Sequence, residues 1–541
     1  MFKKILIANR GAIATRIIRT LQQMGIQAVA IYAEADRDSL HVSSADEAFS
    51  LGEGRAADTY LNQQRILEIA RETGAEAIHP GYGFLSENSN FARLCEASNL
   101  VFLGPTPEQM EAFGLKHSAR ALAQQNDVPL LPGSELLENI EQALAIAQTI
   151  GYPVMLKSTA GGGGIGMSRC DTEDELKNAF NSVKRLGANN FSNDGVFIEK
   201  FITQARHIEV QIIGDGQGHV LALGDRDCSS QRRNQKVIEE APAPNIPDNV
   251  RQSMHEVSVR LMAAVHYRSA GTVEFVYDAQ SHDFYFLEVN TRLQVEHGVT
   301  EAIYQVDLVR WMIEVGAQES TLPAEAPKPH GHAIQVRLYA EDPFKKFQPS
   351  AGLLTEVEFP ELSDLRIDHW IKPGIEISPF FDPMLAKVIS YAESRETAHA
   401  KLLSALKKIS IYGIETNTDY LSHILNDAAF LSASITTRYL DSFVYYPNTF
   451  SVLSPGTMTT VQDYPGRQGY WDIGIPPSGP YDNWSFRLGN RLLGNTEDCA
   501  GLEITLSGPE LVFNCSSQII ITGATIEAKL NGEPIDCWQI Y

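Results

Sequence analysis

Apolar and polar side chains alternate along the stretch Phe284-Tyr285-Phe286-Leu287-Glu288-Val289-Asn290-Thr291-Arg292-Leu293-Gln294-Val295-Glu296-His297. Successive side chains of a strand point to opposite faces, so an extended chain would place the even-numbered polar residues on one side. Leu287, Val289, Leu293 and Val295 would then face a core. The pattern predicts a half-buried strand whose polar side is either a solvent-exposed face or a binding surface.

The chemical types on this polar side favour a binding surface. Carboxylate and amide oxygens, as in Glu288 and Asn290, suit Mg²⁺, which needs only one or two carboxylates when phosphates complete its shell. Glu274, in the apolar run 272–276, offers a further carboxylate one hairpin earlier. Arg292 and Gln294 provide a guanidinium fork and an amide for a small planar oxyanion. We therefore expect a metal-bound nucleotide at one end of this surface and a small anion at the other.

A glycine-rich loop follows another short apolar run, Val154-Met155-Leu156-Lys157. Residues 161–164 are four consecutive glycines, and Gly166 follows after one isoleucine. Such a loop is entropically costly, which makes sense where the backbone approaches a phosphate closely and also moves. The alternative is a surface hairpin loop.

A third feature is the dense charge of residues 225–236, Asp-Arg-Asp-Cys-Ser-Ser-Gln-Arg-Arg-Asn-Gln-Lys. A charge run is usually a solvated face. The apolar run 220–223 directly before it indicates instead that this segment enters the protein. Lys236 is then a candidate anion ligand.

The order of patterns predicts a multidomain chain of α/β and α+β type. In the first hundred residues, short apolar runs alternate with helical patterns, which is typical of βαβ units around a parallel sheet. No G-x-G-x-x-G follows the first run, so a dinucleotide site is not supported. The pattern then becomes mixed α+β, a proline-rich connector covers 323–330, and a break falls near 445–448.

Composition excludes several classes of protein. The 541 residues carry a formal net charge of −23, which repels nucleic acid and anionic membrane surfaces. The six cysteines are scattered without metal-ligand spacing and are expected to be reduced thiols. The basic start is followed by too short an apolar run for a signal peptide, and no run is long enough to span a membrane. We expect a cytoplasmic protein that binds neither nucleic acid nor membranes.

Together these segments resemble the biotin carboxylase family of ATP-grasp ligases over about residues 1–445. The resemblance rests on several motifs in one order: residues 7–11 (Ile-Ala-Asn-Arg-Gly), 79–88 (His-Pro-Gly-Tyr-Gly-Phe-Leu-Ser-Glu-Asn), 161–166, 225–236 and 288–297. It implies a Rossmann-like N-terminal domain over 1–115, an ATP-grasp domain over 116–322 with a lid at about 132–203, and a biotin carboxylase C-terminal domain over 330–445.

The resemblance also implies roles for matched residues. Nucleotide would be held by Lys116, Lys157, Gly163, Gly164, Gly166, Glu199, Lys200, Phe201, Ile202, His207, Gln231 and Asn234. Asn234 departs from the histidine common in this family. Mg²⁺ or Mn²⁺ would be bound by Glu274, Glu288 and Asn290, and bicarbonate by Lys236, Arg292, Gln294 and the Val295 backbone. Glu296 matches the general base, and Arg337 the residue that stabilises the biotin enolate.

Residues 452–541 resemble a second family, the carboxyltransferase domain of urea carboxylase, shared with bacterial relatives of allophanate hydrolase subunit 2. The matching motifs lie at 455–467, 476–480 and 501–505. The match covers the start of that β-rich domain, and no Met-Lys-Met biotin site is present. We expect an N-terminal fragment whose partners are a biotinyl carrier domain and the rest of the carboxyltransferase, with homo-oligomerisation left open.

The combination of the two families predicts biotin carboxylation within a urea carboxylase, with urea or a guanidine-type molecule as carboxyl acceptor. One alternative is the biotin carboxylase of an acyl-CoA or pyruvate carboxylase, whose transferase domains are unrelated to residues 452–541. Another is a non-catalytic interaction protein. Lys236, Arg292 and Glu296 argue against the second alternative, since a non-catalytic protein has no need of an intact anion site.

Overall fold

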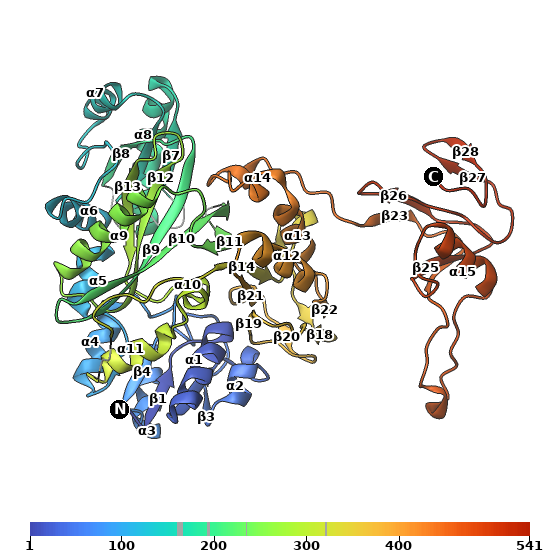
Figure 1. Cartoon of the computed structure of the whole chain (residues 1–541), viewed down its shortest axis with the longest axis horizontal. Coiled ribbons are helices and arrows are strands. Elements are labelled where there is room, and N and C mark those ends of the chain that lie inside the picture. The colour runs from blue at the N-terminus through green and yellow to red at the C-terminus, as the bar shows by residue number, and fades with distance from the viewer. Residues whose placement is uncertain (160–165, 192–194, 234, 320–321) are drawn as a thin grey trace. The chain divides into compact units, whose positions relative to one another are not determined.

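The computed structural model describes residues 1–159, 166–191, 195–233, 235–319 and 322–541. The chain forms two compact units, Met1–Phe443 and Val444–Tyr541, which are described separately (Figure 1). Among the described residues, no helix is long and apolar enough to cross a membrane. The predicted mixture of α/β and α+β folds is confirmed, whereas the predicted domain limits stay predictions.

The chain begins with a parallel sheet of five strands in the order β3-β2-β1-β4-β5. This order, with the first strand in the middle, is that of a Rossmann-like sheet. The strands are β1 (Lys4–Ile7), β2 (Gln27–Tyr32), β3 (Glu47–Ser50), β4 (Ala77–His79) and β5 (Val101–Phe102). Its helices are α1 (Gly11–Met24), α2 (Leu40–Ser44), α3 (Gln63–Thr73) and α4 (Ser89–Ala97), followed by α5 (Pro107–Gly114) and α6 (Lys116–Gln125).

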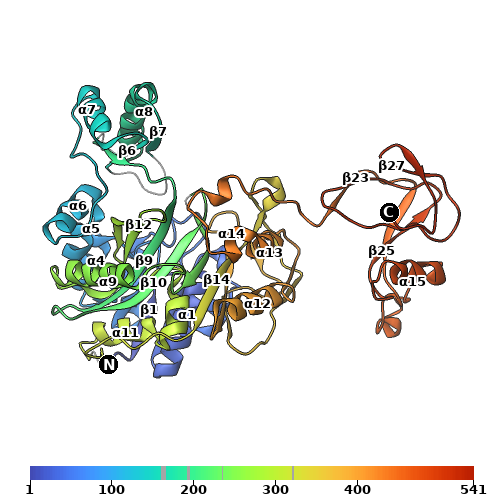
Figure 2. The ribbon, with the colours of Figure 1, turned by 45° about the horizontal axis from the view of Figure 1, so that its top comes forward.

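A small antiparallel sheet in the order β7-β6-β8 makes up the segment predicted as a lid. Its strands are β6 (Val154–Ser158), β7 (Met167–Cys170) and β8 (Val196–Lys200), covered by α7 (Ile140–Ile150) and α8 (Glu173–Phe191) (Figure 2). The predicted nucleotide contacts Gly163 and Gly164, in the loop between β6 and β7, lie outside the described residues.

The largest element is an antiparallel sheet of eight strands in the order β13-β12-β9-β10-β11-β14-β21-β19. Five strands come from the middle of the chain: β9 (Ala205–Asp215), β10 (Val220–Arg232), β11 (Gln235–Ala241), β12 (Arg268–Asp278) and β13 (Phe284–Asn290). Three come from beyond the proline-rich connector: β14 (His332–Tyr339), β19 (Leu365–His369) and β21 (Met384–Ala392). One continuous sheet therefore spans the predicted ATP-grasp and C-terminal domains, joined where β11 pairs with β14.

Helices and short strands complete the first unit. The helices are α9 (Asp248–Ala263), α10 (His297–Tyr304), α11 (Leu308–Gly316), α12 (Arg395–Leu406), α13 (Thr418–Asn426) and α14 (Ala428–Leu431). The short strands are β15 (Glu341–Asp342), β16 (Gln348–Pro349), β17 (Gly352–Leu353), β18 (Glu356–Glu358), β20 (Glu376–Ile377) and β22 (Ser410–Tyr412). A buried cluster joins the parallel sheet to the large one, because Ile7 and Ile17 pack in one core with Ile213, Leu293 and Ile389.

The predicted alternation along residues 284–297 holds only in part. Strand β13 carries a bulge, since Glu274 pairs with Glu288 but Phe275 pairs with Phe286, which leaves Leu287 extra. The bulge changes which residues face the core, so Leu287 is only half-buried. Val295, on the loop that follows, is also half-buried, and the expectation of a core position was wrong for both. The strand ends at Asn290, and Glu296 precedes helix α10. The side chains of Arg292, Gln294 and Glu296 are thus placed by a loop.

The second unit contains three two-stranded antiparallel sheets and one helix. The pairs are β23 (Phe450–Ser454) with β26 (Glu510–Phe513), β24 (Met458–Gln462) with β25 (Gly501–Thr505), and β27 (Ala528–Leu530) with β28 (Glu533–Ile535). Helix α15 (Asn483–Leu492) was not predicted, because one glycine and two asparagines weaken its sequence signal. Large apolar side chains such as Trp471, Tyr481 and Trp484 are exposed on this unit.

Gly81, in the loop after β4, lies against the side chain of Asn9, in the turn after β1. It has a φ of +63°, and an added Cβ would lie 2.8 Å from Asn9 Nδ2, which donates to the carbonyl oxygens of Pro80 and Tyr82. Gly74 also has a left-handed φ, +69°, but open space around it. We predict that Gly74→Ala costs the left-handed penalty of about 1–2 kcal/mol. Gly81→Ala should lower the thermal unfolding midpoint by several degrees more, and equal shifts would contradict the contact argument.

Candidate active site

Three glutamates lie side by side across adjacent strands of the large sheet. Glu274 on β12 is directly opposite Glu209 on β9 and directly opposite Glu288 on β13. All three are largely buried, and like charges opposite one another destabilise a sheet. Arg226 on β10 is opposite Glu209 and donates from Nε to Glu209 Oε1 at 2.6 Å. The row of three glutamates therefore needs neighbouring cations to be stable.

Lys236, at the start of β11, is the shared cation of this site. Its Nζ donates to Glu209 Oε2 at 2.6 Å and to Glu274 Oε1 at 3.0 Å. It also donates to Gln294 Oε1 at 3.1 Å and to Glu296 Oε1 at 2.6 Å. Residues from three separate segments, β9, β12 and the loop after β13, thus converge on one ammonium group. The prediction that the charged segment 225–236 enters the protein is confirmed, since Asp225 and Arg226 are almost completely buried.

Glu296 has a second cationic neighbour in Arg337 on β14. Arg337 Nη2 lies 3.1 Å from Glu296 Oε2, and its Nε donates to Glu239 Oε1 at 2.5 Å. Burial and Glu209 act to raise the pKa of Glu296, but Lys236 and Arg337 outweigh them and lower it. Burial raises the pKa of the neighbouring Cys228 thiol well above its ordinary value. Near neutral pH, Glu296 is therefore a carboxylate and Cys228 a neutral thiol.

Arg292 is held between the loop and the N-terminal part of the chain. Its Nε donates to Glu87 Oε2 at 2.9 Å, and its Nη2 donates to Asn290 Oδ1 at 3.0 Å. The Nδ2 of Asn290 donates to Glu274 Oε1 at 2.8 Å, and the Nε2 of Gln294 donates to the same atom at 3.0 Å. Apart from Glu288 and the Val295 backbone, the predicted metal and bicarbonate residues thus form one connected network.

The residues near Glu274 are suited to a divalent cation. Among the residues that the structure describes, the Glu288 carboxylate forms no ion pair or hydrogen bond, although it is largely buried beside Glu274. Burial and Glu274 raise the pKa of Glu288, as expected where two buried carboxylates lie side by side. Glu288, Glu274 and the amide oxygen of Asn290 are the hard ligands that Mg²⁺ prefers.

The predicted nucleotide residues fall into two groups. Glu199 on β8 is paired with both Lys157 on β6 and Arg120 on α6. Burial acts to raise the pKa of Glu199, but Lys157 and Arg120 lower it. His207 Nε2 lies 3.0 Å from Glu274 Oε2, and its Nδ1 lies 3.0 Å from Gln231 Nε2. His207 and Gln231 therefore lie in the network around Glu274.

Two further residues that were predicted to bind nucleotide, Lys200 and Phe201, contact neighbouring protein groups in this structure. Lys200 Nζ donates to the carbonyl oxygens of Gly151 and Tyr152 at 2.8 and 3.2 Å. Two guanidinium groups approach the ring of Phe201, with Arg169 4.6 Å and Arg438 5.9 Å from its centroid. Half-buried Ile202 follows β8, and Gly166 has a φ of +77°. Asn234, whose nucleotide contact the resemblance leaves in doubt, lies outside the described residues.

Burial lowers the pKa of Lys116, the first residue of α6, below its ordinary value. Lys157 acts in the same direction and Glu288 against it. Among the described residues, the side chain of Lys116 forms no ion pair or hydrogen bond, so its ammonium group is available to an anion. This is a reasonable location for a phosphate group.

Sequence reasoning missed four residues of the network: Glu209, Arg226, Glu239 and Glu87. Glu209 could have been found, because His207, Glu209 and Gln211 repeat polar side chains at alternate positions of a predicted strand. Arg226 was quoted only as part of a charge run. Glu87 meets Arg292 over a separation of 205 residues, which no local pattern reveals.

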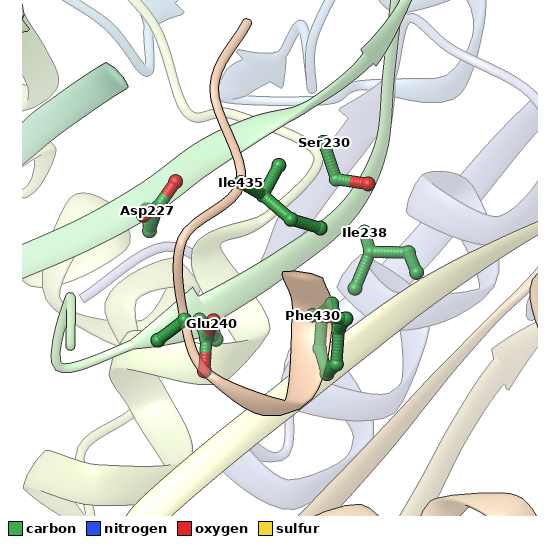
Figure 3. Close-up of a pocket in the computed structure, with 7 residues that line it drawn as sticks. Asp227, Ser230, Ile238, Glu240, Phe430 and Ile435 are labelled. Carbon is green, nitrogen blue, oxygen red and sulfur yellow. The ribbon is translucent and has the colours of Figure 1, made fainter. Parts of the chain in front are cut away.

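A small pocket elsewhere in the first unit is distinct from this network. Asp227, Ser230, Ile238 and Glu240 from β10 and β11 line it together with Phe430, Ala433 and Ile435 (Figure 3). Asp227 and Glu240 are already paired there with Arg206 and Arg395. None of the predicted site residues is among these seven lining residues, so the pocket is not the candidate active site.

Family models match four successive parts of the chain. They are "Biotin carboxylase, N-terminal domain" at 1–110, "Carbamoyl-phosphate synthase L chain, ATP binding domain" at 116–324, "Biotin carboxylase C-terminal domain" at 335–442 and "Carboxyltransferase domain, subdomain A and B" at 473–541. Biotin carboxylase 1 of Bacillus subtilis is 45% identical over 445 residues, which are 82% of this chain and 99% of that protein. The chain belongs to the biotin carboxylase family. The resemblance inferred from sequence is confirmed.

Two other relatives extend this comparison. Urea amidolyase of Saccharomyces cerevisiae is 48% identical over 99% of this chain, which spans 29% of that relative's length. The crystal structure of the biotin carboxylase domain dimer of Hydrogenobacter thermophilus 2-oxoglutarate carboxylase, in complex with MgADP, ADP and bicarbonate, has a TM-score of 0.78 and 43% identity. That match covers 82% of this chain and 97% of the solved chain.

The shared ammonium group makes a pH-dependent prediction for Lys236→Met. In the wild-type chain, burial acts to raise the pKa of Glu209, but Lys236 and Arg226 lower it from 4.5 to about 2. The stabilisation from this carboxylate is thus present above pH 4.5 and is lost only as the pH falls toward 2. Without Lys236, burial should raise the pKa values of the clustered carboxylates, and stability should fall as the pH rises.

We therefore expect Lys236→Met to lose about 3–5 kcal/mol near pH 7, as for other broken buried pairs, and the loss to shrink toward pH 5. Thermal unfolding at several pH values measures this. Lys177→Met removes an exposed pair with Glu173 and serves as the control. A loss for Lys236→Met that does not depend on pH would contradict the account.

Proposed function

We propose that the first unit carboxylates biotin with bicarbonate at the expense of ATP, as the biotin carboxylase part of a urea carboxylase. The observation that carries this proposal is the shared Lys236. It holds Gln294 and the ionised Glu296 next to each other, while Arg337 approaches the other oxygen of Glu296. An anion site, a base and a second cation thus meet within one network.

In the proposed nucleotide end, Lys116 and Lys157 bind ATP phosphates, and the loop that carries Gly163, Gly164 and Gly166 covers them. Glu199, Lys200, Phe201 and Ile202 hold the adenine at the lid strand, and His207, Gln231 and Asn234 line the nucleotide. Lys157 would exchange its pairing with Glu199 for phosphate, a charge-assisted contact of similar kind. The available ammonium of Lys116 supports this assignment.

Glu274, Glu288 and Asn290 would hold Mg²⁺ or Mn²⁺. When bound, the ion would offset the negative charge of the phosphates during transfer. The position of Glu288 directly opposite Glu274 in the sheet supports this ligand set. The third glutamate of the row, Glu209, forms hydrogen bonds with Arg226 and Lys236, one to each of its carboxylate oxygens.

At the other end, Lys236, Arg292, Gln294 and the Val295 backbone would hold bicarbonate. Glu296 removes its proton, and a bicarbonate oxygen attacks the γ-phosphorus of ATP, which gives carboxyphosphate and ADP. Carboxyphosphate breaks down to CO₂ and phosphate where water is excluded. Phosphate takes the proton from biotin N1, Arg337 stabilises the resulting enolate, and the nitrogen attacks CO₂ to form carboxybiotin.

The proposed carboxyl acceptor is urea, with a guanidine-type molecule as the alternative. It rests on the match of residues 473–541 to a carboxyltransferase model and on the likeness to urea amidolyase along almost the whole chain. The proposed partners are a biotinyl carrier domain, the rest of the carboxyltransferase and a second copy of the chain. Exposed Trp471, Tyr481 and Trp484 on the second unit fit such further packing.

The first functional prediction concerns the half-reaction. The purified chain should hydrolyse ATP when Mg²⁺, bicarbonate and free biotin are all present, because the proposed site lies within the first unit. Phosphate release measures this reaction, with each component omitted in turn. A rate that does not fall when bicarbonate is omitted would contradict the proposal.

The second functional prediction divides the site into two ends. Glu296→Ala and Arg337→Ala should lower turnover and leave nucleotide affinity nearly intact, because they act on charges that change during the reaction. Lys157→Ala and Glu288→Ala should weaken binding of Mg-ATP by a few kcal/mol, as for other charge-assisted contacts. Calorimetry and phosphate release distinguish the pairs. Equal losses of ATP binding for Glu296→Ala and Lys157→Ala would refute the division.

A further inference from the structure

Lys387, on β21, is a completely buried lysine outside the residues assigned above. Its Nζ donates to the backbone carbonyl oxygen of Val295 at 3.0 Å and lies 3.4 Å from Asp368 Oδ2. Burying an ammonium group is costly, so this position needs a purpose beyond filling space. Val295 lies between Gln294 and Glu296, the two loop residues that share Lys236.

The register of the large sheet explains how Lys387 reaches this carbonyl. Lys387 is directly opposite Arg337 on β14 and directly opposite Asp368 on β19. Directly opposite residues share one face of a sheet, so the three charged side chains form a row. Arg337 contacts the carboxylate of Glu296, and Lys387 contacts the carbonyl one residue earlier. Two residues of this row, Arg337 and Lys387, thus hold the loop through the side chain of Glu296 and through its backbone.

Asp368 keeps Lys387 in place through a larger buried network. Its carboxylate accepts from Arg366 Nη2 at 2.7 Å and from Arg19 Nη2 at 2.9 Å. Arg366 in turn donates to Glu301 on α10, the helix that begins directly after Glu296. A second buried side chain, His297, lies with its Nδ1 2.7 Å from the carbonyl oxygen of Gln294. Consecutive carbonyls of the loop are therefore bound from behind by buried side chains.

We propose that Lys387 is a positioning residue of the carboxylation reaction, which fixes the backbone of residues 294–296 so that Gln294, the Val295 amide and Glu296 meet bicarbonate in one geometry. The inference rests on the proposed function of these loop residues. Lys387 does not touch the reacting atoms. Its effect is to keep the loop from moving, and displacements of about 1 Å in such a site can reduce rates by about a hundredfold.

Lys387→Met keeps the length and apolar stem but removes the donor. Lys401 provides a matched control, because its Nζ also donates to a backbone carbonyl, that of Tyr391 at 3.0 Å, and pairs with an aspartate, Asp364 at 3.1 Å, away from the loop. We expect Lys387→Met to raise the KM for bicarbonate or lower kcat about tenfold, with the KM for ATP within about twofold. Lys401→Met should change none of these.

A second readout does not depend on catalysis. Amide hydrogen exchange of the full chain should become faster in the peptide that covers residues 293–299 of Lys387→Met, and stay unchanged in the lid and in Lys401→Met. If the wild-type chain shows no bicarbonate-dependent ATP hydrolysis, the proposed function fails, whereas the exchange result still decides whether Lys387 orders the loop.

The proposal is overturned if folded Lys387→Met has wild-type constants for bicarbonate or wild-type exchange in this peptide. Should Lys387→Met not fold, Lys387→Gln is judged by the same measurements. This variant keeps a polar group at the position, on a shorter side chain and without the charge. Failure of both variants to fold would also overturn the proposal, because Lys387 would then be required for folding and not specifically for positioning the loop.

Discussion

The ammonium group of Lys236 lies among three buried carboxylates and an amide oxygen, and the arrangement of the first unit follows from this crowding. Removing several carboxylates from water costs several kcal/mol for each ion, even after the protein relaxes. A sheet face that carries Glu209, Glu274 and Glu288 in one row is stable only with cations beside it. The chain supplies Arg226 and Lys236, and the proposed metal ion would complete the set.

The same constraint accounts for the continuous sheet. Strand β11 carries Lys236 at one end and pairs with β14, which carries Arg337. Glu296, on the loop after β13, needs both cations to remain ionised while buried. The segments before and after the proline-rich connector are therefore joined by backbone hydrogen bonds and by one shared carboxylate. A site assembled in this way has little freedom to change the distance between its anion end and its biotin end.

Part of the network could be predicted from sequence, because several of its residues lie on strands with a clear alternation. Glu274, Glu288 and Asn290 followed from parity and ligand chemistry, and Lys236 from an apolar run that leads into a charged segment. The bulge at Leu287 could not be predicted, since it depends on pairing with β12. Contacts such as Glu87 with Arg292 and Lys387 with Val295 join distant segments, which only the folded chain brings together.

The central claim is that bicarbonate itself attacks ATP in this site. The most direct test is to incubate the chain with ¹⁸O-labelled bicarbonate, ATP, Mg²⁺ and free biotin. The reaction is stopped before bicarbonate exchanges its label with water, and the mass of the released phosphate is determined. The account predicts one ¹⁸O atom per phosphate, because the bridging oxygen of carboxyphosphate stays with phosphorus when CO₂ leaves. Phosphate that carries oxygen only from ATP and water would contradict it.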